Sequence, residues 1–190
     1  MSAEEEIHVV TDWKILRAVA DVKVKVPTEI TYENGIRWGY DIPSDEDPLR
    51  WFKLLLLREN DMSKTIRDST QIICAREMLR QQKKDVVDVV GDYLRLLWNS
   101  AMQDIGKQLP RQSVDGMPFR VVITVPAIWP TYAQESMRKA AEKAGILAER
   151  LSGETELQFI PEPEAAALAS FADRRYPYQV RASLYSCPRR

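Results

Sequence analysis

The stretch that decides the fold is VVITVPAIWPTYAQESMRKAAEKAGI, residues 121–146. Its first part belongs to the run FRVVITV, residues 119–125, which shows no polar alternation apart from Thr124. A strand of this kind is typical of a parallel α/β sheet in which both faces are covered. We therefore predict a central strand here, followed by a helix.

The turn and the helix that follow the strand have their own signals. Pro126–Pro130 is predicted to be a turn, because two prolines bracket it. Thr131 and Gln134 have the spacing of a capping box, which favours a helix start. Gly145 stands where a helix C-terminal cap belongs. The sequence therefore predicts a strand, a turn and a capped helix in succession.

A second stretch, FIPEPEAAAL at residues 159–168, repeats the strand-to-helix pattern. Phe159 and Ile160 are predicted to form a short strand, and Pro163 suits the first turn of an alanine-rich helix. From Asp173 to the last residue the sequence carries five arginines without periodicity. We expect this tail, residues 173–190, to be disordered and unrelated to the rest.

Read together, these two stretches resemble the seventy-kilodalton heat-shock (DnaK-type) chaperone family, whose nucleotide-binding domain has the actin-like fold. The resemblance rests on VITVPA, on the helix ending in AG, and on EPEAAA. Upstream, VPTEITYENGIRWGYDIP (26–43) and WFKLLLL (51–57) look closest to a divergent, fungal-type branch. The resemblance implies an α/β fold: an incomplete actin-like (ribonuclease H-like) ATPase lobe with a helical and β insertion subdomain.

The resemblance implies roles for particular residues. Glu162 matches the glutamate that lies near the terminal phosphate and helps to hold water. Lys53 matches the lysine that reaches the transferring phosphate. Pro126 matches a proline that couples the nucleotide state to domain movement. Gln134 stands where the family has the arginine that works with this proline, so interdomain signalling of the usual form is not expected.

Each of these residues also has a simpler interpretation. Glu162 and Glu164 can be acids that stabilise a helix N-terminus. Lys53 can be a surface lysine, and Pro126 can simply end a strand. The five tryptophans are expected to serve packing rather than to form a stacking platform.

ATP and Mg²⁺ are the cofactors that the resemblance implies, but two phosphate-binding loops of the family are missing here. The seven glycines include no adjacent pair and no G-x-G, and neither D-x-G-T nor D-x-G-G occurs. Glycine is the residue that lets backbone N–H groups approach phosphate oxygens closely. We therefore expect the chain alone neither to bind ATP and Mg²⁺ nor to hydrolyse ATP, and a truncated or misread gene model is one explanation of its tail.

We expect four segments along the chain: a leftover core strand (1–12), an insertion subdomain (13–117), a strand-helix-strand-helix core (118–172) and the tail. Within the insertion, the alternation over Val22–Tyr32 predicts a strand, and Asn34-Gly35 predicts a hairpin turn with Ile36–Tyr40 returning. Leu49–Leu57 and Lys83–Ile105 are predicted helices.

The composition excludes several classes of protein. The net charge of -1 argues against a nucleic-acid binder. No apolar run approaches the ~18 residues of a membrane span. His8 is the only histidine, so a zinc site is not expected, and Cys74 and Cys187 match no metal spacing. These features suggest a cytoplasmic protein without a metal centre.

An alternative to the ATPase fragment stays open. A retained lobe surface, together with the long helix Lys83–Ile105, could bind a protein partner without any catalysis. An enzyme of another class is disfavoured, because no nucleophile–base pair is evident.

Overall fold

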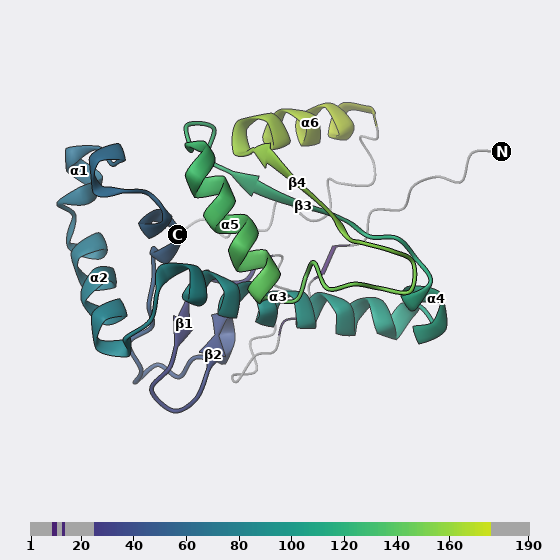
Figure 1. Ribbon diagram of the computed structural model, residues 1–190, viewed down its shortest axis with the longest axis horizontal. Helices are drawn as coiled ribbons and strands as arrows, with labels where there is room; N and C mark the ends of the chain where they lie inside the picture. Colours follow the sequence, from purple (N-terminus) through teal and green to yellow (C-terminus); the bar gives the residue numbers. More distant parts are fainter. Residues whose placement is uncertain (1–8, 11–12, 14–24, 176–190) are drawn as a thin grey trace, which may run out of the picture.

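The structure is a computed structural model that describes residues 9–10, 13 and 25–175. These residues form a mixed α/β arrangement with small sheets (Figure 1). In chain order the elements are β1 (Ile30–Thr31), β2 (Arg37–Trp38), the 3₁₀ helices η1 (Gly39–Asp41), η2 (Phe52–Leu56) and η3 (Glu59–Asp61), α1 (Lys64–Arg67), α2 (Thr70–Gln82), α3 (Val86–Gln108), α4 (Arg111–Asp115), β3 (Arg120–Val125), α5 (Thr131–Lys143), β4 (Glu156–Pro161) and α6 (Glu162–Arg175).

The two strands predicted around the central stretch pair with each other. β3 and β4 are parallel, in a register that places Val121 opposite Leu157 and Val125 opposite Pro161. Leu157 and Val125 are buried on the face that packs against the helices. Val122 points the other way and is 44% exposed, so the prediction of a strand covered on both faces was wrong.

Helix α5 follows the predicted turn, in which the Trp129 N–H donates to the Pro126 carbonyl at 3.1 Å. The N-cap of α5 is Pro130, without a side-chain cap, so the predicted capping box does not form. Thr131 is already the first helical residue and is therefore one position too late to cap. Gly145 has a φ of +79° just after the helix and makes the predicted C-terminal cap.

Helices α3 and α5 pack against each other and form the centre of the molecule (Figure 1). Gly91 of α3 lies at the contact: a Cβ there would stand 3.2 Å from the Ala140 carbonyl oxygen and 3.2 Å from the Lys143 Cβ. Ala133 and Ala140 of α5 are fully buried. Small side chains on both helices thus allow a close approach of the two backbones.

The buried core joins this helix pair to η2 and to the end of β3. Phe52 and Leu56 of η2 are buried against α3, and the Phe52 and Tyr93 rings lie 5.7 Å apart. Trp129 is buried in the same cluster, whereas Trp51 is 54% exposed and does not belong to the core.

The predicted helix over Leu49–Leu57 is wrong. Leu49 instead exchanges two backbone hydrogen bonds with Ile30, at 3.2 and 2.8 Å. Trp51 has a φ of 61°, a left-handed conformation that interrupts any α-helix through this segment. Only the short 3₁₀ helix η2 follows it.

The hairpin is confirmed but shorter than predicted. β1 and β2 are antiparallel, and Ile30 pairs with Trp38 across the turn at Asn34-Gly35. The predicted return strand Ile36–Tyr40 ends early, because η1 begins at Gly39. Of the predicted strand Val22–Tyr32, residues 22–24 lie outside the described residues, and only Ile30–Thr31 is a strand.

The long helix is confirmed with shifted ends. Lys83 has a φ of 50° and caps α2, and the Asp85 carboxylate accepts the Val87 N–H at 2.7 Å to start α3 at Val86. Helix α2, over Thr70–Gln82, was not predicted from the sequence.

The remaining predictions concern the two ends of the chain. Pro163 lies in the first turn of α6 as predicted, and this helix continues to Arg175. Most of segment 1–12, His8, Cys187 and residues 176–190 lie outside the described residues. The proposed segment boundaries therefore stay predictions. No helix in the described part of the chain is both long and apolar enough to cross a membrane.

A pair of glycine substitutions in α3 tests the close approach of α3 to α5. Gly91→Leu should lower the free energy of unfolding by about 1–3 kcal/mol, because the buried contact becomes overpacked. Gly106→Leu is the matched control in the same helix, because a Cβ at Gly106 would have no atom within 4 Å. This substitution should raise the free energy of unfolding by roughly 0.5–1 kcal/mol through helix propensity. Chemical denaturation measures both, and equal effects at the two sites would contradict the packing.

Candidate functional site

The residues predicted from the sequence to carry chemistry meet at the end of the parallel sheet. Glu162 begins α6 directly after β4, and Pro126 directly follows β3. Because parallel strands end at the same edge of a sheet, both lie at its carboxyl edge (Figure 1). Lys53, in η2, reaches this edge from the other part of the chain.

The contact between Lys53 and Glu162 is a direct ion pair. The Lys53 Nζ donates to Glu162 Oε1 at 2.7 Å, across 109 residues of sequence. The side chains are 36% and 45% exposed, so both are open to solvent and to a ligand. Glu162 also stands in the first turn of α6, at the positive end of the helix dipole.

Trp129 is a third residue at this site, beside Lys53 and Glu162. It was predicted from the sequence to serve packing. Its ring is 5% exposed, and the Lys53 ammonium lies over it at 5.8 Å from the centroid. The ammonium therefore has both an aromatic ring and a carboxylate as neighbours. Trp129 follows Pro126 by three residues, which was the only sequence signal for its place here.

Neither Pro126 nor Gln134 forms a hydrogen bond or an ion pair with Lys53 or Glu162 in the described part of the chain. Pro126 contributes through its carbonyl, which accepts the Trp129 N–H. Gln134 lies in α5, in the turn after Tyr132, and its N–H donates to the Pro130 carbonyl at 3.3 Å. The structure thus brings together Lys53 and Glu162, with Pro126 fixing the loop beside them.

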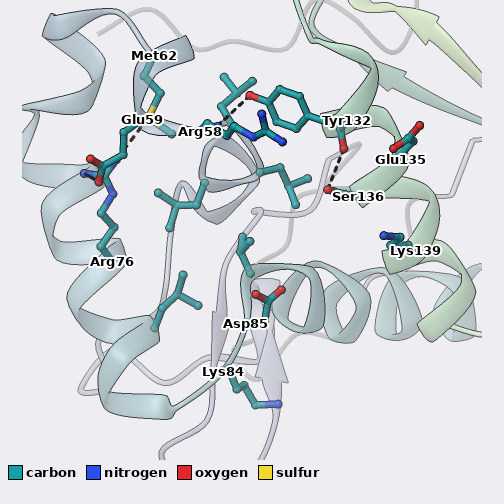
Figure 2. Close-up of a pocket in the computed structure, with 15 residues that line it drawn as sticks. Arg58, Glu59, Met62, Arg76, Lys84, Asp85, Tyr132, Glu135, Ser136 and Lys139 are labelled. Atoms are coloured by element: carbon teal, nitrogen blue, oxygen red, sulfur yellow. Dashed lines mark hydrogen bonds and ion pairs between the residues drawn. The ribbon is translucent and has the colours of Figure 1, made fainter.

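A cleft of about 680 Å³ lies between α2 and α5, next to η2 (Figure 2). Its lining includes the apolar side chains of Leu55, Leu57, Leu79 and Val86. Arg58 and Tyr132 stand on its wall. Neither Lys53 nor Glu162 lines it, so the cleft and the ion pair are separate features that share the η2 segment.

A second charged group is centred on Asp92 in α3, which is 8% exposed. Burial works against its charge, but hydrogen bonds from Lys84 at 2.9 Å and Tyr32 at 3.0 Å outweigh this, with the charge of Arg95 in addition. The pKa of the Asp92 carboxyl is therefore held below its usual value. With every oxygen occupied by protein donors, this group ties the hairpin to α3 and is structural.

The residues present fit ATP and Mg²⁺ only in part. A lysine and a carboxylate can contact a phosphate and its water, but the described glycines provide no backbone cradle around them. In the described part of the chain no group of three or more His, Cys, Asp or Glu side chains could hold a metal ion. No catalytic step through the nucleotide follows from this arrangement.

Comparison of the chain with protein-family models, with curated proteins and with solved structures finds no match. The family resemblance of the sequence therefore stays a hypothesis.

The energy of the Lys53–Glu162 contact can be measured directly. A double-mutant cycle with Lys53→Met and Glu162→Gln should give a coupling of about 0.2–1 kcal/mol in urea unfolding, because both groups are exposed. The coupling should shrink in 1 M salt, where the Debye length falls to ~3 Å. A coupling of zero at low salt would mean that the contact makes no net contribution to stability.

The Asp92 group predicts an acid-sensitive contribution to stability. The pKa of the Asp92 carboxyl is lowered in the folded state. The stabilisation from its ionised form is therefore complete above the unfolded-state pKa of about 4. It is lost as the pH falls through the folded-state pKa. Asp92→Asn should therefore lower the free energy of unfolding at pH 7 by about 1–3 kcal/mol. This deficit should shrink below pH ~4; a deficit that is independent of pH would contradict the assignment.

Proposed function

We propose that this chain is part of the first lobe of an actin-like ATPase related to the seventy-kilodalton heat-shock chaperones. Lys53 and Glu162 are then the two side chains that face the terminal phosphate of a nucleotide. Lys53 would contact a phosphate oxygen, and Glu162 would orient water or the hydration shell of Mg²⁺.

One observation carries the proposal. Lys53 and Glu162 belong to separate motifs, 109 residues apart in the chain. Even so, the Lys53 Nζ lies 2.7 Å from Glu162 Oε1. Two unrelated surface residues would have no reason to meet at the carboxyl edge of a parallel sheet. That edge is also where open α/β folds bind their ligands.

The energetics limit what this pair can do alone. A hydrogen bond to a charged group contributes about 1.5–3 kcal/mol. A millimolar complex requires about 4 kcal/mol. With one lysine and no backbone cradle, the described residues should bind a triphosphate more weakly than ~1 mM. We therefore expect weak, Lys53-dependent contact with phosphate and no turnover by this chain alone.

The alternative is a non-catalytic module that binds a protein partner. It is favoured by large apolar side chains that stay exposed on β3, on the loop after it and on α6. These are Val122 at 44%, Ile128 at 86%, Leu168 at 55% and Phe171 at 61% exposed. Exposed apolar side chains are common, so this observation weighs less than the ion pair.

An NMR titration separates the two functions. With ATP and Mg²⁺ at several millimolar, amide shifts should change at Lys53, at Trp129 and at Glu162, and Lys53→Met should abolish the change. Lys139→Met is the matched control, because Lys139 is an exposed lysine of α5 without a recorded ion pair in the described part of the chain. If ATP leaves these amides unchanged, the nucleotide proposal fails and the module is the better interpretation.

A further inference from the structure

Residues 129–132, which run from the end of the loop after β3 into the first turn of α5, contact the start of η2 and the backbone just after its end. Trp129 lies beneath Lys53, which is near the start of η2. Tyr132 contacts Arg58, two residues after η2 ends. One short segment, residues 129–132, therefore contacts the η2 region at two points: at Lys53, near the start of η2, and at Arg58, just after its end.

The Tyr132 side chain makes three contacts, two of them with Arg58, which lies beside it in Figure 2. Its hydroxyl accepts the Arg58 backbone N–H at 3.0 Å and donates to the Asp61 carboxylate. Its ring lies 4.3 Å from the Arg58 guanidinium carbon, measured to the centroid. These contacts fix the backbone of the η2–η3 connection and not merely the side chains around it.

Helix η2 is a short 3₁₀ helix of five residues. It begins after Trp51, whose φ of 61° is unfavourable for a bulky residue. Backbone hydrogen bonds also mark its two boundaries: the Leu54 N–H donates to the Trp51 carbonyl at 3.0 Å, and the Leu57 N–H donates to the Leu54 carbonyl at 3.1 Å. Because 3₁₀ hydrogen bonds are poorly aligned, such a segment depends on outside contacts for its position.

Phe52 and Leu56 supply part of that outside restraint, since both are buried in the core. Lys53 lies between them in sequence but points outward, and its position also depends on how η2 is rotated about its own axis. A contact at Arg58 fixes the far end of the segment and so limits this rotation. The Tyr132 hydroxyl is the group that makes this contact.

We propose that Tyr132 is a positioning residue: its hydroxyl, by holding the Arg58 end of η2, keeps the Lys53 ammonium between Trp129 and Glu162. The expected effect on the position of the Lys53 ammonium does not depend on the proposed function. Any effect on phosphate binding rests on the proposed function. Tyr132 is half-buried and its hydroxyl lies at the surface, so its removal should leave the fold intact.

The test follows Lys53 itself by NMR of the chain with labelled lysine. The protons next to an ammonium that lies over an indole ring are shifted upfield by the ring current. The Lys53 signal is assigned by its absence in Lys53→Arg. In Tyr132→Phe the upfield shift of the Lys53 signal should be lost. Asp61→Ala removes the acceptor of the Tyr132 hydroxyl and should make the upfield shift of Lys53 smaller.

Tyr40→Phe is the matched control. The Tyr40 hydroxyl also makes one exposed hydrogen bond, to the Lys25 carbonyl at 2.8 Å, but Tyr40 lies in η1 rather than at the Arg58 end of η2. Its loss should leave the Lys53 signal unchanged. The proposal is overturned if Tyr132→Phe leaves the Lys53 shift at the wild-type value, or if Tyr40→Phe changes it equally.

The same variants separate this inference from the proposed function. If wild-type chain responds to ATP, Tyr132→Phe should weaken that response towards the level of Lys53→Met. If wild-type chain does not respond, the nucleotide proposal fails, while the Lys53 ring-current shift still decides the role of Tyr132.

Discussion

The close packing of α3 against α5 is the contact on which the other parts of the structure depend. The β3–β4 sheet lies against one region of this pair, and η2 is buried against another. Gly91, with only a hydrogen atom at the contact, sets how near the two helices come. If they were separated, the sheet and η2 would lose the common surface that places them relative to each other.

The candidate site is a product of that placement. Glu162 is fixed by β4 and α6, whereas Lys53 is fixed by η2, and no short-range signal connects them. They meet because both supports rest on the same helix pair. Residues 129–132, at the start of α5, lie at the junction, where Trp129 contributes a buried ring to the core and Tyr132 an exposed hydroxyl to the connection after η2.

The sequence predicted best those features that local chemistry determines. The FRVVITV strand, the Gly145 cap and the Asn34-Gly35 turn depend on neighbouring residues, and each is present. The helix over Leu49–Leu57 failed because tertiary pairing of Leu49 with Ile30 overrides local propensity. Lys53 and Glu162 came from a family resemblance. Trp129 and Tyr132 were missed because their partners lie more than 70 residues away in the chain.

The sequence separation of Lys53 and Glu162 has a consequence for folding kinetics. A contact across 109 residues closes a long loop, and such contacts form after local helices and turns. A nascent chain can therefore complete its helix pair before the ion pair exists. A ligand that recognises Lys53 and Glu162 together would bind only chains in which the last tertiary contacts have formed, and would slow their unfolding.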